Sequence, residues 1–223
     1  MVTGDTSHPE LCRVCRVHGG AEQSGGGASL EEATRRRAIE IARELALEDA
    51  VGTVRLRDVA RRSGIAEHEL YRHFSSSDHL LVLAQHDWIR HALEDSPLPP
   101  GDGGDRVAEL VHRSLAATAA APRFVSAVLA SQSSVDPAVR RAHVMSNREL
   151  SDMLREAAGP ELVDADTYIQ LVGATWLGVL SAWRLGNMTI EHADCVAQRT
   201  ARLLYRSMLE EQREQQGSTQ HAG

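Results

Sequence analysis

The chain has 223 residues, enough for one large domain or for a small domain joined to a larger one. It is 42% hydrophobic and 25% charged, which is ordinary for a globular protein, and only 4% aromatic, which leaves the core mostly to Leu, Val and Ala. The net charge of −7 argues against a protein that coats nucleic acid through bulk positive charge.

The charge is distributed unevenly along the chain. Residues 31–76 hold nine Arg and nine acidic residues, whereas residues 78–223 hold 13 Arg and 19 acidic residues. The N-terminal third is therefore the region where the DNA backbone can be tolerated electrostatically. All 24 basic residues are Arg, which suits bidentate contacts with phosphate, although so complete a bias is more typical of genomic base composition.

Cysteine usage and hydropathy predict a cytoplasmic protein. Three cysteines, Cys12, Cys15 and Cys195, cannot form a disulfide framework, and no apolar signal-peptide core follows the N-terminus. Residues 167–183 are 17 uncharged residues in a row, at the short limit for a transmembrane helix, but Gln170 lies among them. A buried or partner-facing helix is favoured over a membrane span, so we expect no membrane partner.

The N-terminal half is predicted to be a glycine-rich tail followed by helices. Residues 1–29 contain six Gly and no periodic apolar pattern, which predicts a disordered tail. Apolar residues then recur at three- and four-residue spacing from residue 31 to about 49. Two short helices fit 56–63 and 67–74, and a longer one follows until the Pro/Gly-rich stretch 96–105, which predicts a loop.

Beyond this loop the pattern is helical throughout. Asp136-Pro137 is typical of a helix start, and Gly159-Pro160 is typical of a helix end. Two more helices fit 164–186 and 189–213, and residues 214–223 are expected to be a second disordered tail. Since no segment alternates with period two, the sequence predicts an all-α fold.

The segment RLRDVARRSGIAEHELYRHF, residues 55–74, has the spacing of a helix-turn-helix. Gly64 occupies the position that needs a sterically permissive turn. Leu70 and Phe74, one turn apart, would anchor the second helix. At about 100° per residue, this arrangement turns His68, Glu69 and Arg72 outward and places Tyr71 and His73 on the flanks. Such a polar row can meet base edges in the major groove, and its flanks can meet phosphates.

From about Arg35 to Ala84 the chain resembles the DNA-binding domain of TetR-family transcriptional repressors. The resemblance is carried by LRDVARRSGIA and LYRHF, together with Ile39, Ala42, Ser76 and Leu80. It implies a three-helix helix-turn-helix domain at residues 30–77, followed by a larger helical ligand-binding and dimerisation domain at 78–213. Family members commonly contact phosphate at the positions of Tyr71 and His73.

Three positions depart from the family pattern. Ala66 replaces the usual Ser or Thr cap, Ser77 replaces a usual Lys, and Glu69 replaces a frequent Thr. Glu67 and Glu69 lie in the first helical turn, where the helix dipole favours acids. Glu69 can also accept a hydrogen bond from cytosine N4, which predicts a role in base selection. The expected DNA-binding residues are Arg35, Arg55, Arg57, His68, Glu69, Tyr71, Arg72, His73 and Ser77.

The larger region is expected to bind an effector and to form the dimer. The resemblance implies a pocket within residues 106–186, and its expected apolar lining favours a small hydrophobic effector: Phe124, Val128, Met145, Met153, Trp176 and Leu180. The fragments VRLRDVA and WLGVLSAW also resemble actinobacterial repressors of steroid breakdown, which implies a steroid-like or acyl-CoA-like ligand. The last two helices should pair with a second copy through Leu171, Thr175, Val179, Trp183, Val196 and Leu203.

The function expected from these features is a transcriptional regulator, most simply a repressor, that binds a palindromic DNA operator as a homodimer and is released by the effector. A metal-responsive sensor is an alternative, because Cys12, Cys15 and His18 are potential ligands and Asp87 and His91 share a helix face, but zinc needs four ligands. A helical ligand-binding protein with weak DNA binding is another. No catalytic motif occurs, so neither an enzyme nor a cofactor is expected.

Overall fold

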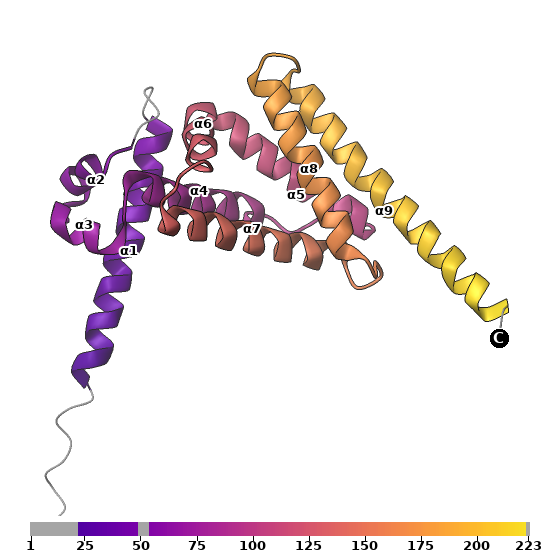
Figure 1. The fold of residues 1–223 in the computed structure, drawn as a ribbon, viewed down its shortest axis with the longest axis horizontal. Coiled ribbons are helices and arrows are strands. Elements are labelled where there is room, and N and C mark those ends of the chain that lie inside the picture. The colour runs from indigo at the N-terminus through magenta and orange to yellow at the C-terminus, as the bar shows by residue number, and fades with distance from the viewer. Residues whose placement is uncertain (1–21, 49–53, 222–223) are drawn as a thin grey trace, which may run out of the picture.

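The computed structural model describes residues 22–48 and 54–221, and within these ranges the chain forms helices and no strand (Figure 1). This confirms the predicted all-α fold. The helices are α1 (Glu22–Glu48), α2 (Leu56–Ser63), α3 (Glu67–His73), α4 (Ser77–Glu94), α5 (Gly103–Ala120), α6 (Pro122–Ser131), α7 (Pro137–Ala158), α8 (Ala165–Arg184) and α9 (Ile190–His221).

A first hydrophobic core holds α1, α2 and α3 against the start of α4. Ile41, Val59, Leu70 and Phe74 are buried in it. Gly64 ends α2 with φ of 74°, a left-handed conformation that costs glycine little, and its N–H donates to the Ala60 carbonyl. The predicted turn glycine therefore sets the angle between the two short helices.

The first core continues into α6 and α7. Phe124 and Val128 of α6, and Val139 and Ala142 of α7, belong to the same buried cluster as Leu70 and Phe74. The indole of Trp88 on α4 stacks on Phe124, with ring centroids 5.6 Å apart. Packing is therefore continuous across residue 77, the predicted domain boundary.

A second core lies at the opposite end, where α8 and α9 run side by side over α5 (Figure 1). Tyr168 and Tyr205 are buried there with centroids 5.7 Å apart, and each hydroxyl donates to a backbone carbonyl at 3.0 Å. Gly103 lies so close to Tyr205 that a Cβ would be 2.6 Å from its ring. The glycine therefore allows α5 to pack directly on α9.

Three helices are longer than the sequence pattern predicts. α1 begins at Glu22, inside the segment 1–29 expected to be disordered, and α9 continues to His221, through most of the expected tail 214–223. Once a helix is nucleated by its packed part, each added residue gains a hydrogen bond, so polar ends can continue it. α5 starts at Gly103, within the expected loop 96–105, because Asp102 caps it by accepting from the Asp105 N–H at 2.9 Å.

No single helix in the described ranges is long and apolar enough to cross a membrane. The pair α5 and α6 meets the length and composition requirement together, but the two helices are bent by 101° against each other.

Candidate nucleic-acid interface

Helix α3 presents a polar face above two buried anchors. Leu70 and Phe74 are fully buried, as their spacing predicts. His68, Tyr71 and Arg72 are exposed, and Tyr71 keeps 56% of its surface accessible. Glu69 and His73 are half-buried, so they lie at the edges of the exposed face. The helix can therefore offer a hydroxyl, an imidazole, a guanidinium and a carboxylate to one groove of a duplex.

The start of α3 has no side-chain cap. Ala66 is the N-cap residue, with extended backbone, and its methyl side chain cannot accept a capping hydrogen bond. Glu67 and Glu69 lie in that turn, where their negative charge interacts favourably with the helix dipole. The local stabilisation of α3 therefore comes from these acids and from the burial of Leu70.

Several predicted arginines are accessible or only weakly paired. Arg72 lies 3.2 Å from Glu31 and Arg35 lies 3.9 Å from Glu32, both pairs being largely exposed to solvent. Arg55 and Arg57 are exposed and form no ion pair within residues 30–48 and 54–218. Exposed ion pairs contribute little free energy, so a phosphate can displace Glu31 from Arg72 and Glu32 from Arg35.

Ser77 has a structural role that its position in the sequence did not predict. Its Oγ accepts a hydrogen bond from the Leu56 N–H at 3.2 Å, which joins the start of α2 to the start of α4. Ser76 caps α4 by accepting from the His79 N–H. The two serines therefore fix the orientation of the helix-turn-helix on α4.

Asp136 connects the start of α7 to the segment that follows α3. One carboxylate oxygen accepts from the Ala138 N–H at 2.8 Å, and the other accepts from the Ser75 hydroxyl at 2.6 Å and the Ser76 hydroxyl at 3.4 Å. The Ser75 hydrogen bond, followed by that of Ala138, holds the pKa of this carboxyl below its usual range. The sequence identified Asp136 only as a helix cap, because a contact across about 60 residues leaves no local signal.

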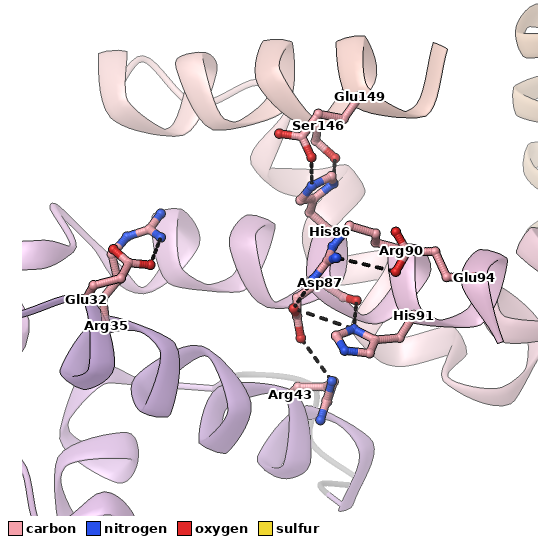
Figure 2. A network of polar contacts seen from close by, with 10 residues as sticks. All are labelled: Glu32, Arg35, Arg43, His86, Asp87, Arg90, His91, Glu94, Ser146 and Glu149. Atoms are coloured by element: carbon pink, nitrogen blue, oxygen red, sulfur yellow. Dashed lines mark hydrogen bonds and ion pairs between the residues drawn. The ribbon is translucent and has the colours of Figure 1, made fainter. Parts of the chain in front are cut away.

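Neighbouring side chains on α4 bind helices on opposite sides of it (Figure 2). Asp87 accepts from Arg43 of α1 at 2.9 Å. His86 contacts α7 through Glu149 Oε2 at 2.7 Å and Ser146 Oγ at 2.9 Å. Any shift of α4 must therefore change its contacts with α1 and α7 together.

The six predicted effector contacts do not surround one cavity. Phe124 and Val128 are buried in the first core, and Leu180 is fully buried. Met145 is exposed beside a groove of about 380 Å³ between α1, α4 and α7. Met153 lines a separate hollow of about 300 Å³ with Leu93, Leu98 and Leu110. Trp176 packs against the second core, where its Nε1 has no hydrogen-bond partner among the described residues. Helical spacing cannot distinguish core from pocket lining, since both are apolar.

The predicted dimer contacts divide into two groups. Leu171 and Leu203 are exposed, at 44% and 56%, as a contact with a second copy requires. Val179 is buried within the protomer. Thr175, Trp183 and Val196 are half-buried, and the latter two pack against the second core. Of the α8 positions predicted to contact a second copy, Val179 therefore faces the core of its own protomer, whereas Leu171 faces solvent.

Only part of the alternative metal site can be placed in the fold. Cys12, Cys15 and His18 lie outside the described residues. Asp87 and His91 share a helix face as predicted, but His91 Nδ1 lies 2.6 Å from the Asp87 carbonyl oxygen, and the Asp87 carboxylate pairs with Arg43 and Arg90. No group of three or more potential metal ligands occurs in the described part of the chain.

Residues 38–84 match the family model of the bacterial regulatory proteins of the tetR family. A TetR transcriptional regulator from Rhodococcus sp. RHA1 is 29% identical, with a TM-score of 0.63 over 76% of this chain and 95% of that one. A TetR-family regulator from Streptomyces coelicolor is 17% identical, with a TM-score of 0.52 over 86% of this chain and 98% of that one, which supports the fold alone. No curated protein sequence matched significantly.

The matched region coincides with the helix-turn-helix and includes the two buried anchors of α3. The Rhodococcus structure extends the similarity over the helices that follow α4. The family model therefore covers the helix-turn-helix, and the structural similarity includes the larger helical region. Residues 38–84 thus carry a domain of the tetR type, and the chain is similar over most of its length to a TetR transcriptional regulator.

Proposed function

We propose that the protein is a repressor that binds a palindromic operator as a homodimer and is released by a small hydrophobic effector. The observation that carries this proposal is the polar face of α3, held outward by the complete burial of Leu70 and Phe74. In this arrangement His68, Glu69 and Arg72 read base edges, and Tyr71 and His73 position the helix on phosphates. Arg35, Arg55 and Arg57 add phosphate contacts around it.

The outer face of α8 supports the homodimer. Leu171 and Leu177 are each 44% exposed, and Leu185 continues the face beyond the helix end. A Cβ added at Gly173 or Gly178 would meet no atom within 4 Å, so a second helix can approach closely. An apolar helix face of this kind is stable only when it is covered. A second copy covers it and places two α3 helices on two half-sites.

The hollow beside Met153 is the better candidate for the effector. Its other apolar lining comes from Leu93 at the end of α4, Leu98 in the following loop, Leu110 of α5 and Ala157 of α7, and the charged side chains of Arg106 and Glu156 complete it. Its volume of about 300 Å³ is at the lower end for ligand sites. A steroid-like or acyl-like molecule that enlarges this hollow would displace the end of α4, and the α4 contacts with α1 and α7 would carry that change to the DNA-binding domain. The site of action is the cytoplasm.

The test is binding of purified protein to labelled DNA from upstream of its own gene, across a salt series and beside a scrambled duplex. Repression through an operator predicts specific binding whose logarithm falls steeply and linearly with log salt. Equal binding to the two duplexes would contradict an operator in that DNA. It would favour the alternative of a helical ligand-binding protein with weak DNA binding.

A further inference from the structure

Helix α7 exposes several arginines to solvent. Arg140, Arg141 and Arg148 are exposed, and none of them forms an ion pair within the described part of the chain. Arg155, further along the same helix, lies 2.6 Å from Asp166 and is also paired with Asp152. The protein is acidic overall, so unpaired guanidinium groups grouped on one helix are available to an anionic partner.

The first two of these arginines lie where α7 meets the helix-turn-helix. Val139 and Ala142, which flank them, are buried in the same core as Leu70 and Phe74 of the recognition helix. The Arg140 N–H donates to the Asp136 carbonyl at 3.1 Å, which closes the first turn of α7. The side chain of Asp136 is in turn bonded to Ser75, two residues after the end of α3. Arg140 and Arg141 thus lie about one helical turn after Asp136, the residue that joins α7 to the segment following α3.

Positive charge converges at this joint from two helices. His79, in the first turn of α4, is half-buried beside it. Burial lowers its pKa, Asp136 opposes that effect, and the positive charges of Arg35 and Arg141 lower the pKa further. Arg35 of α1 and Arg141 of α7 therefore both add positive potential at His79, although they are more than a hundred residues apart in the sequence.

We propose that Arg140 and Arg141 bind the phosphodiester backbone of the operator beside the groove that α3 enters, so that α7 extends the DNA interface beyond the helix-turn-helix. This inference rests on the proposed DNA-binding function. A guanidinium forms bidentate hydrogen bonds with phosphate, and such contacts raise affinity without reading sequence. DNA is favoured as the anionic partner because the hydrogen bond between Ser75 and Asp136 joins the start of α7 to the segment that follows α3. Arg148 lies about 12 Å further along the helix axis and takes no part.

The experiment compares the double variant R140Q/R141Q with the control R148Q, which removes an equally exposed and unpaired arginine from the same helix. Binding to operator and scrambled DNA is measured across a salt series. For the double variant we expect the slope of log K against log salt to become shallower by about 1 for each phosphate that is no longer bound. Affinity at low salt should fall by the same factor on both duplexes, so that discrimination between them is unchanged. R148Q should match the wild type.

A hydroxyl-radical footprint gives a second readout. The double variant should lose backbone protection at the flanks of the site and keep the protection centred on the α3 contacts. An unchanged slope and footprint would overturn the α7 extension while leaving the proposed function intact, whereas a wild type that binds no DNA would overturn the proposed function itself. Vesicles of phosphatidylglycerol test the alternative that the anionic partner is a lipid surface. If the double variant lost binding to these vesicles while its salt slope on DNA stayed unchanged, the arginines would be assigned to a lipid surface and the proposal would be overturned.

Discussion

Helices α3 and α8 expose opposite kinds of surface. α3 is seven residues long, buries Leu70 and exposes a row of polar and charged side chains. α8 is 20 residues long, buries Tyr168 and Leu180, and exposes Leu171 and Leu177 together with two glycines. Water solvates the first surface well and the second poorly.

The difference shows what each end of the molecule requires from a partner. The face of α3 is stable in water, so DNA must compete with solvent through charge and hydrogen bonds, and the complex should be sensitive to salt. The face of α8 loses water favourably, so a second copy of the chain should bind it tightly and with little dependence on salt. The two surfaces can therefore be tested by substitutions that affect one and spare the other.

The largest expected effect comes from the anchor of α3. Leu70→Ala removes a fully buried side chain from the first core, and we expect a loss of about 2–5 kcal/mol in the free energy of unfolding. Chemical denaturation measures this loss. Tyr71→Phe, at the exposed neighbouring position, is the control and should change stability by less than about 0.5 kcal/mol. Equal effects of the two substitutions would mean that α3 is not anchored as described.

A substitution on the apolar face of α8 should have nearly as large an effect, but on dimer assembly and not on folding. Leu177→Asp places a charge where the second copy is proposed to pack, and burying an uncompensated charge costs about 3 kcal/mol or more. We expect the dimer dissociation constant, measured by sedimentation, to rise at least about a hundredfold. Val163→Asp, an exposed apolar position outside α8, is the control. A Leu177→Asp variant that sediments like the wild type would contradict this dimer face.

A smaller and more selective effect is expected at the edge of α3. Glu69→Ala should lose discrimination at one cytosine-containing base pair by about 1–3 kcal/mol, as measured by competition between operator variants. Glu67→Ala removes an acid from the same helical turn and serves as the matched control, with a loss of a few tenths to about 1 kcal/mol in stability and unchanged discrimination. Unchanged discrimination in Glu69→Ala would limit Glu69 to a structural role.

The smallest expected effect is a pH dependence of stability in the acid range, caused by Asp136 and His79 at the joint between α7 and the helix-turn-helix. The folded pKa of Asp136 is lowered mainly by the Ser75 hydrogen bond, so its contribution is present above the unfolded carboxyl pKa and is lost as pH falls through the folded pKa. The folded pKa of His79 is lowered mainly by burial, so protonation of the unfolded state also lowers stability as pH falls. Asp136→Asn should flatten the acid limb of Tm against pH. An unchanged profile would mean that the joint contributes nothing.

Sequence patterns predicted the elements whose limits are set by neighbouring residues. The helix 56–63 agrees with the structure, and 67–74 differs by one residue, because Gly64 and the spacing of Leu70 and Phe74 are local signals. The sequence pattern did not separate the two sides of α8, because nearly the whole helix is apolar and only the contact of Tyr168 with Tyr205 and Ala201 shows which stripe faces α9. The joint at Asp136 was missed for a related reason, since Ser75 is distant in the sequence.

The most direct test of the central claim is selection of binding sites from a pool of randomised duplexes by the purified full-length protein, with the stoichiometry of the selected complex measured by sedimentation. Two α3 helices related by the α8 interface predict an enriched inverted repeat whose half-sites are separated by one helical turn of DNA or a multiple of it. Enrichment of no sequence, or of a single half-site bound by one chain, would contradict the proposal that this protein reads DNA as a dimer.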